Sequence, residues 1–302
     1  MSSMRHDPSH RRPILGSVTR LVGDGSDVRG RRPSLSIIVP AKNEADSLPQ
    51  LVAEITAAFR PKVLGQTEGS RLDAFEIVVV DDGSTDASPN VLRDLMIETP
   101  ELRPVTLARN VGQSGATAAG FRAARFDYVA ILDADLQNNP ADLASLWDAL
   151  PGHDAALGWR VKREDVWSKR VISRWANGVR NWVLGQTIRD TGCSVRIFPR
   201  EAALRLPMFH GVHRFFGPLL LRDGCKIVQV PVTHRPRPHG ISHYNLWNRS
   251  LKVIVDLFGV AWLMRRAIRY ELAPSPNEAA IPPANRSSTA LATSRPNAAK
   301  ES

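Results

Sequence analysis

The residue group best suited to chemistry is Asp133-Ala134-Asp135-Leu136-Gln137, which directly follows an apolar run. In extended backbone, residues i, i+2 and i+4 share one face, so Asp133, Asp135 and Gln137 are expected to point the same way. Two carboxylates held together repel each other unless a cation lies between them. A set of oxygen ligands favours Mg²⁺ or Mn²⁺, completed by water and substrate phosphates. The pattern therefore predicts a metal site, and a solvated turn is the alternative.

A second acidic stretch, residues 81–86 (Asp-Asp-Gly-Ser-Thr-Asp), also follows an apolar run. Asp, Ser and Thr are common in turns and helix N-caps, which is one interpretation. The other is that a carboxylate accepts hydrogen bonds from a base or ribose, and both can hold together. The sequence has no Gly-x-x-x-x-Gly-Lys-Ser/Thr loop, and no Gly-x-Gly-x-x-Gly follows its first strand. We therefore expect a nucleotide held by carboxylates and a metal.

These polar stretches need a scaffold, and the chain alternates strand-like and helix-like segments. Apolar, often β-branched runs predict strands at 35–39, 76–80, 105–107 and 128–132. Apolar residues at helical spacing predict helices at 48–59, 91–97 and 115–124. The alternation predicts an α/β fold with a mostly parallel central sheet and helices on both faces. Ligands of such sheets bind beyond the carboxyl ends of the strands, where the polar stretches should converge.

The composition places this scaffold in the middle of the chain. The sequence has 302 residues and 43% hydrophobic content, enough for a buried core. Cys193 and Cys225 are too few for a disulfide framework or a four-ligand zinc cluster. A basic arm at 1–33 and a Pro-, Ala- and Ser-rich tail at 273–302 are predicted to be disordered, which leaves 34–244 for the domain.

Residues 245–272 predict a C-terminal amphipathic helix. Its charged residues fall roughly on one side: Arg249, Lys252, Asp256 and Arg266. The remaining surface is broadly apolar and carries Trp262. Such a helix is typical of one lying in the headgroup region of a membrane, whereas packing on the core or in a dimer interface is the alternative. No stretch of the chain reaches the roughly 18 apolar residues of a membrane span.

Several stretches, in this order and spacing, resemble the family 2 glycosyltransferases. They are residues 36–44, 80–86, 110–115 and 133–135. Three more are similar to the dolichyl- and polyprenyl-phosphate sugar transferase branch, the dolichol-phosphate mannosyltransferase-like enzymes. These are residues 132–140, 190–196 and 237–244. The resemblance covers residues 34 to 260 and implies a Rossmann-like GT-A fold that binds a nucleotide sugar.

The resemblance also implies roles for individual residues. The donor nucleotide site would include Pro40, Lys42, Glu44, Asp81 and Asp82. The metal and diphosphate site would include Asp133, Ala134 and Asp135, with Gln137 as a further metal ligand and Arg160 near the donor phosphates. Asp133, Asp135 and Arg160 are the catalytic candidates.

An acceptor phosphate is expected at Arg237, Ser242 and His243, which fall on an Arg-x-x-Gly-x-Ser-Lys pattern. His243 stands where the branch usually has lysine, and Lys42 stands where it often has an aromatic residue. Since a histidine is only partly charged near neutrality, anion binding there is expected to be weaker or pH-dependent. A structural role for His243 is the alternative.

The implied activity is metal-dependent, inverting transfer of a sugar from a GDP-mannose or UDP-hexose type donor to a polyprenyl or dolichyl phosphate. A net charge of +10 suits an anionic acceptor and peripheral attachment to the cytoplasmic face of a membrane. A transmembrane partner chain or a homo-oligomer is compatible with this setting. A non-lipid acceptor in cell-surface polysaccharide synthesis is the alternative. A nucleic-acid binder is disfavoured, because aromatic content is 6% and no nucleic-acid motif is present.

Overall fold

A computed structural model describes residues 32–66, 72–161, 178, 183–185, 187–236 and 246–266. The expected arm at 1–33 and tail at 273–302 lie almost entirely outside these residues. So do Arg237, Ser242 and His243. These expectations therefore stay predictions.

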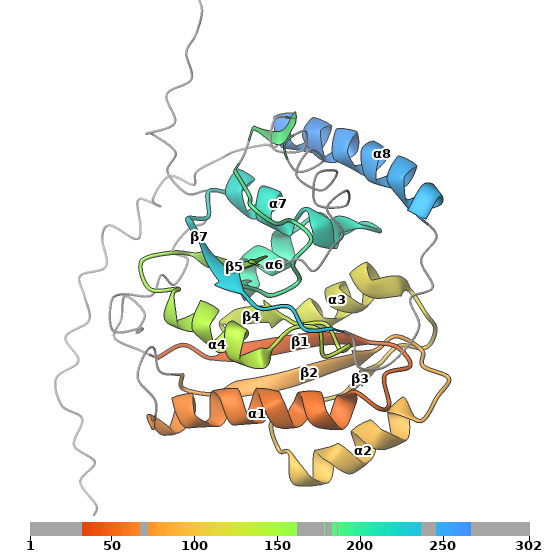
Figure 1. The fold of residues 1–302 in the computed structure, drawn as a ribbon, viewed down its shortest axis with the longest axis vertical. Helices are drawn as coiled ribbons and strands as arrows, with labels where there is room; N and C mark the ends of the chain where they lie inside the picture. Colours follow the sequence, from red (N-terminus) through yellow and green to blue (C-terminus); the bar gives the residue numbers. More distant parts are fainter. Residues whose placement is uncertain are drawn as a thin grey trace, which may run out of the picture. The chain divides into compact units, whose positions relative to one another are not determined.

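The described strands form one seven-stranded sheet in the order β3-β2-β1-β4-β6-β5-β7 (Figure 1). Its strands are β1 (Leu35–Ala41), β2 (Phe75–Asp81), β3 (Val105–Thr106), β4 (Tyr128–Ile131), β5 (Ala155–Arg160), β6 (Arg196–Pro199) and β7 (Ile227–Val232). β6 runs antiparallel to β4 and β5, and the remaining pairs are parallel. The expected mostly parallel sheet is confirmed, and each strand expected from an apolar run is present.

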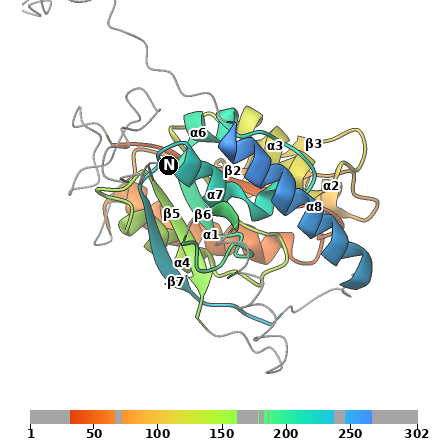
Figure 2. The same cartoon turned by 90° about the horizontal axis from the view of Figure 1, so that it is seen from above.

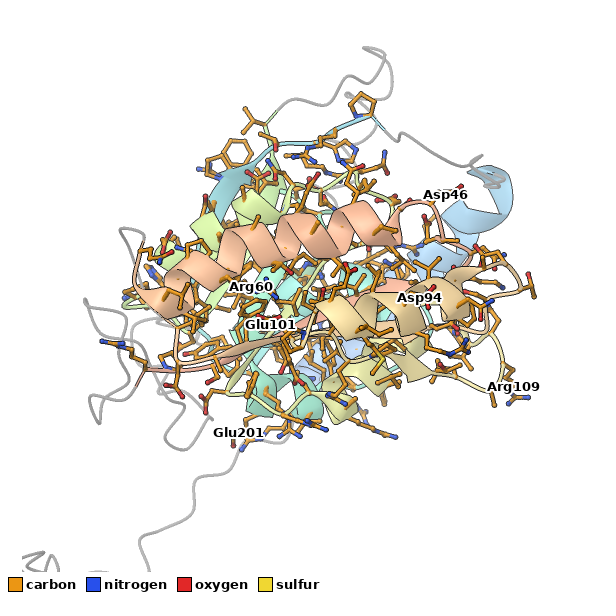
Figure 3. The ribbon with its side chains drawn as sticks, turned by 90° about the horizontal axis from the view of Figure 1, so that it is seen from below. Asp46, Arg60, Asp94, Glu101, Arg109 and Glu201 are labelled. Atoms are coloured by element: carbon orange, nitrogen blue, oxygen red, sulfur yellow. The ribbon has the colours of Figure 1, made fainter. Side chains whose placement is uncertain are left out.

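Helices cover both faces of this sheet, as expected. They are α1 (Leu48–Leu64), α2 (Ser88–Glu98), α3 (Gly112–Ala123), α4 (Pro140–Asp148), α6 (Arg200–Arg205), α7 (Phe216–Arg222) and α8 (Leu246–Arg265), with a 3-10 turn η2 (Val212–Arg214). One core cluster packs α1, α2 and α4 on one face, and the other packs α3, α6, α7 and α8 on the opposite face. On the α1 side, Arg60 of α1 and Glu101 after α2 form an ion pair at 2.8 Å (Figure 3).

α1 runs five residues beyond its expected end at Phe59, although Pro61 lies inside it. The extra turn is held by Lys62, which is buried and places its Nζ 2.7 Å from Asp148 of α4. Gly65 then ends the helix in a left-handed conformation with φ of 69°. The tertiary contact with α4 therefore outweighs the tendency of Pro61 to end the helix.

α3 lies unusually close to the sheet because its inner face is built from small residues. A Cβ on Gly120 would lie 2.3 Å from the Cγ2 atom of Ile38 in β1. Gly120 and the buried Ala116 thus allow α3 to pack closely against β1 and β2.

α8 divides its apolar residues between two faces. Leu257, Val260 and Ala261 are buried in the core cluster that also holds α3 and α7. An exposed face carries Ile254, Val255, Phe258 and Trp262, which we call the α8 stripe. Packing on the core, the alternative for this helix, is confirmed, and its position in a membrane headgroup region stays a prediction.

α8 crosses the side of the sheet that carries α7 (Figure 2). The carboxylate of Asp256 lies against Gly211, just before η2. Among the described helices, none is long and apolar enough to cross a bilayer.

Candidate active site

The three polar stretches meet at one edge of the sheet. Ala41 at the end of β1 pairs with Asp81 at the end of β2, and Ile131 at the end of β4 pairs with Ile38 of β1. The loops after β1 and β2 therefore leave the sheet at the same level, and β4 ends three residues earlier at the same carboxyl edge. This confirms the expected convergence at the carboxyl ends of the strands.

The backbone of residues 133–137 differs from the expectation. β4 ends at Ile131, and the following segment turns instead of extending. Leu136 has φ of 59°, and the Asp135 carboxylate accepts a hydrogen bond from the Gln137 backbone N–H at 3.2 Å. The expected extended backbone at residues 133–137 is therefore wrong. Burial nevertheless alternates along this turn. Ala134 and Leu136 are buried, whereas Asp133, Asp135 and Gln137 are partly exposed.

Asp133 lies in a polar environment that favours a compensating cation. Burial raises the pKa of Asp133, and the negative charge of Asp135 raises it further. Hydrogen bonds from Ser194 and Gln113 and the positive charge of Arg196 act in the opposite direction. The Gln113 Nε2 atom lies 2.9 Å from Asp133 Oδ1. A bound cation would relieve the repulsion between these carboxylates.

The donor set fits Mg²⁺ or Mn²⁺ that shares its coordination with substrate. Within the described residues, no group of three or more His, Cys, Asp or Glu side chains is placed to hold a metal. Protein ligation would therefore come from Asp133 and Asp135, with the Gln137 amide oxygen. Few protein ligands, completed by water and phosphate, are typical of Mg²⁺ sites.

The loops after β1 and β2 are joined by reciprocal hydrogen bonds. Asn43, with φ of 55°, donates its backbone N–H to Ser84 Oγ at 2.9 Å, and its side-chain oxygen accepts the Thr85 N–H at 2.8 Å. The Glu44 backbone N–H donates to Ser88 Oγ at 3.0 Å, and the Glu44 side chain accepts from Ser47 before α1. These bonds fix the two loops expected to border the nucleotide.

The hydrogen bonds of residues 81–86 support the interpretation of this stretch as a turn that caps helices. The Asp82 carboxylate accepts the backbone N–H groups of Val111 and Gly112 at 2.7 and 2.8 Å, at the start of α3. Asp82 therefore bonds the start of α3 across the sheet edge, while Asp86 of the same stretch accepts the Ser88 N–H at 3.0 Å at the start of α2. Asp81 is buried and accepts the Ser84 N–H at 2.9 Å. Contact of Asp81 or Asp82 with a donor stays a prediction, as it does for Pro40 and Lys42 at the end of β1.

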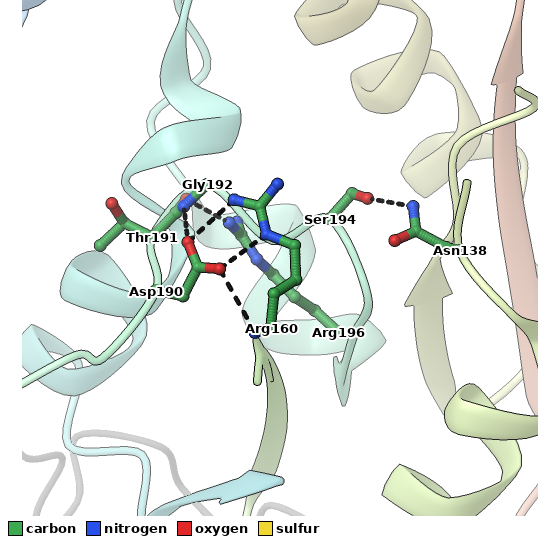
Figure 4. Close-up of polar contacts among 7 residues, drawn as sticks. All are labelled: Asn138, Arg160, Asp190, Thr191, Gly192, Ser194 and Arg196. Carbon is green, nitrogen blue, oxygen red and sulfur yellow. Dashed lines mark hydrogen bonds and ion pairs between the residues drawn. The ribbon is translucent and has the colours of Figure 1, made fainter. Parts of the chain in front are cut away.

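Arg160 ends β5 and forms a bidentate ion pair with Asp190, at 2.7 and 3.1 Å (Figure 4). Asp190 also accepts the Gly192 N–H at 3.0 Å. Asp190 is thus a salt-bridge partner of Arg160. The pair fixes the guanidinium plane, and contact of Arg160 with donor phosphates stays a prediction.

Sequence reasoning missed the residues that surround Asp133. Gln113 and Ser194 donate to its carboxylate, and the buried Arg196 contributes positive charge. Each lies inside a stretch that carries the family resemblance, which is the signal that could have singled them out. Their contacts join segments that are distant in sequence, so spacing alone does not predict them.

The residues just before the expected acceptor segment lie next to the turn at residues 133–137. The Arg235 backbone N–H donates to the Gln137 carbonyl oxygen at 2.8 Å, and the Arg235 side chain pairs with Glu54 of α1 at 2.8 Å. Thr233 donates to the Asp142 carboxylate through both its backbone N–H and its hydroxyl. The residues that lead into the segment containing Arg237 are thus anchored beside Gln137.

Comparison with known proteins places the chain in a family. A model described as glycosyl transferase family 2 matches residues 36–207. The dodecaprenyl-phosphate galacturonate synthase of Rhizobium johnstonii is 35% identical over 241 residues, which are 78% of this chain and 68% of that protein. An undecaprenyl-phosphate 4-deoxy-4-formamido-L-arabinose transferase of Edwardsiella ictaluri is 35% identical over 227 residues, 74% of this chain and 66% of that protein. The chain thus spans about two thirds of the length of these relatives.

A solved structure shares the fold. The mannosyltransferase PcManGT of Pyrobaculum calidifontis, in complex with GDP-Man and Mn²⁺, aligns with a TM-score of 0.56 at 24% identity. The alignment covers 79% of this chain and 66% of that one. The expected GT-A fold is confirmed. The family match and the relatives confirm the resemblance read from the motifs, and the chain belongs to glycosyl transferase family 2, with similarity to its polyprenyl-phosphate sugar transferases.

Proposed function

We propose that this chain transfers a sugar from a nucleotide-sugar donor to a polyprenyl phosphate at a membrane surface, with the cytoplasmic face as the expected side. The observation that carries the proposal is the placement of Asp133 and Asp135 in the turn after β4, where Gln113 lies 2.9 Å from the Asp133 carboxylate and Asp135 accepts the Gln137 N–H. The names of the two relatives support a polyprenyl-phosphate acceptor. The donor is of the GDP-mannose or UDP-hexose type.

The transfer exchanges one bond to the anomeric carbon for another. An oxygen of the acceptor phosphate attacks this carbon, the bond to the donor diphosphate breaks, and the nucleoside diphosphate leaves with the electron pair. Attack from the opposite side inverts the anomeric configuration. A phosphate monoester has a second pKa of about 6 and is largely dianionic at neutral pH, so this acceptor requires no general base.

The described residues supply positioning and charge. Asp133, Asp135 and Gln137 would hold Mg²⁺ or Mn²⁺ against the diphosphate, where the ion supplies positive charge to the leaving group. Arg160, oriented by Asp190, and the buried Arg196 add positive charge on the β5 and β6 side. The loops after β1 and β2, which are joined by the hydrogen bonds of Asn43 and Ser84, would border the nucleotide.

The α8 stripe supports attachment to a membrane surface. Ile254, Val255, Phe258 and Trp262 are each at least 50% exposed on one helix. Arg266 lies over the Trp262 ring at 5.4 Å, so cationic and aromatic groups occur together at the end of the stripe. Trp beside arginine at the edge of an apolar face is typical of interfacial helices.

The test is transfer of label into lipid. The purified chain is incubated with polyprenyl phosphate, Mg²⁺ or Mn²⁺, and a panel of labelled nucleotide sugars, and organic-extractable label is measured. We expect one donor to label the lipid, and Asp135→Asn to lower the rate by about 100-fold or more, as loss of electrostatic stabilisation does elsewhere. Asp94→Asn, an exposed carboxylate of α2, is the matched control (Figure 3). Donor binding without lipid labelling would instead favour a non-lipid acceptor.

A further inference from the structure

The 3-10 turn η2 contacts the first turn of α3 from outside the sheet. The His213 Nδ1 atom is hydrogen-bonded to Ser114 Oγ at 3.0 Å, and the Gly211 backbone N–H donates to the same oxygen at 3.0 Å. Ser114 is buried, and its contact with His213 joins residues 99 positions apart in sequence. The start of α3 is therefore held from two directions, by Asp82 at its backbone and by η2 at Ser114.

The same turn is also tied to the loop that precedes β6. Arg196 donates to the carbonyl oxygen of His213 and, at 2.8 Å, to that of Thr191. The Arg196 side chain is buried and lies over the Phe216 ring at 5.6 Å. One guanidinium thus joins η2 to the Thr191–Ser194 loop, and Figure 4 shows Arg196 beside Thr191 in that loop.

The two residues that contact η2, Ser114 and Arg196, lie close in sequence to described residues that donate hydrogen bonds to the Asp133 carboxylate. Gln113, next to Ser114 on α3, reaches the carboxylate at 2.9 Å. Ser194, in the loop that Arg196 holds, is the other donor and is itself bonded to Asn138 at 2.9 Å. Each of these donors to the Asp133 carboxylate thus lies near a residue, Ser114 or Arg196, that contacts η2.

We infer that His213 is a positioning residue for the metal and diphosphate site, acting through Ser114 on Gln113 and Asp133. This inference rests on the proposed function, because it supposes that Asp133 binds a cation. Groups that orient metal ligands through hydrogen bonds typically change metal affinity by about 10- to 100-fold when removed. His213 itself contacts neither metal nor donor in this scheme.

The experiment measures metal affinity directly. Free Mn²⁺ is followed by electron paramagnetic resonance during titration of the full chain, in the presence of UDP and, separately, of GDP. We expect His213→Leu to weaken Mn²⁺ binding by about 10-fold, the lower end of that range, because His213 acts through Ser114 and not on Asp133 directly. His213→Asn keeps a hydrogen-bonding group near the position of Nδ1 and should restore most of the affinity. Ser114→Ala, which removes the shared hydroxyl, should reproduce the loss.

Ser36→Ala is the matched control for lost stability. The Ser36 hydroxyl is buried and bonds Glu76 at 2.7 Å, near the amino end of β1 and away from the site. This variant should lower the melting temperature and leave Mn²⁺ affinity unchanged. Wild-type affinity in both His213→Leu and Ser114→Ala, or a loss in Ser36→Ala equal to theirs, would overturn the role of His213. Failure of the wild-type chain to bind Mn²⁺ with either nucleotide would overturn the proposed metal site, and the inference with it.

Discussion

Among single residues, Glu76 connects charge to stability most directly. It is buried at the amino end of β2, where Arg103 lies 3.0 Å away and Ser36 and the Arg125 backbone N–H also donate to it. Burial alone would raise the pKa of Glu76, but these hydrogen bonds and the charge of Arg103 outweigh it and lower the pKa below its ordinary value. The folded state therefore prefers the ionised carboxylate.

The lowered pKa of Glu76 predicts a loss of stability in acid. A carboxylate with a depressed folded-state pKa stabilises the protein above its unfolded pKa, and this contribution is lost as pH falls through the folded value. We expect the free energy of unfolding to fall below about pH 4.5, and Glu76→Gln to flatten this limb while lowering stability at pH 7. Urea unfolding at a series of pH values measures both effects.

Glu201→Gln is the control for the acid limb. Glu201 forms an exposed i,i+4 pair with Arg205 on α6, and such pairs contribute little to stability. The free energy of unfolding of Glu201→Gln should depend on pH in the same way as that of the wild-type chain. An acid limb of unchanged slope in Glu76→Gln would assign the effect to other carboxylates.

At the scale of elements, the contact between the β2–α2 turn and the loop before α3 has no room for a Cβ at Gly83. Gly83 has φ of 65°, and a Cβ there would lie 2.8 Å from the backbone nitrogen of Asn110. Backbone cannot move aside as a flexible side chain can. The turn must therefore shift, together with Asp81 and Asp82 on its flank.

Gly83→Ala is expected to destabilise the chain more than backbone conformation alone requires. Gly152→Ala is the matched control, because Gly152 has φ of 78° and nothing within 4 Å of its Cβ position. The control should cost about 1 kcal/mol for the left-handed conformation. Gly83→Ala should cost about 1–3 kcal/mol more from overpacking, and should weaken nucleotide binding. Equal costs in denaturant unfolding would mean that the two loops adapt freely.

Elements were more predictable than the loops they carry. The strand at 128–132 could be predicted because a continuous apolar run is typical of a strand that is buried on both faces. The turn at 133–137 could not, because the left-handed Leu136 is set by its burial and by the Asp135–Gln137 hydrogen bond. The metal candidates follow from local sequence, whereas Gln113, Ser194 and His213 meet Asp133 or its neighbours only through the tertiary fold.

At the scale of the whole molecule, net charge and the α8 stripe point to the same partner. The sequence carries a formal charge of +10, which attracts anionic lipid over roughly a Debye length of 8–10 Å. The stripe then offers apolar side chains on the outer face of a helix whose other face is fixed in the core. Charge would bring the chain to the surface, and the stripe would hold it there.

Binding to vesicles separates these contributions. We expect the chain to float with vesicles containing anionic lipid, and less so with zwitterionic vesicles or at high salt. Replacing Phe258 and Trp262 with serine should weaken anionic-vesicle binding by about 10-fold or more, because each aromatic ring contributes about 1.5–3 kcal/mol when fully buried. Ile97→Ser, at an 83% exposed residue of α2, should have no effect. If the double variant bound as tightly as wild type, the stripe would not enter the bilayer, and charge alone would account for attachment.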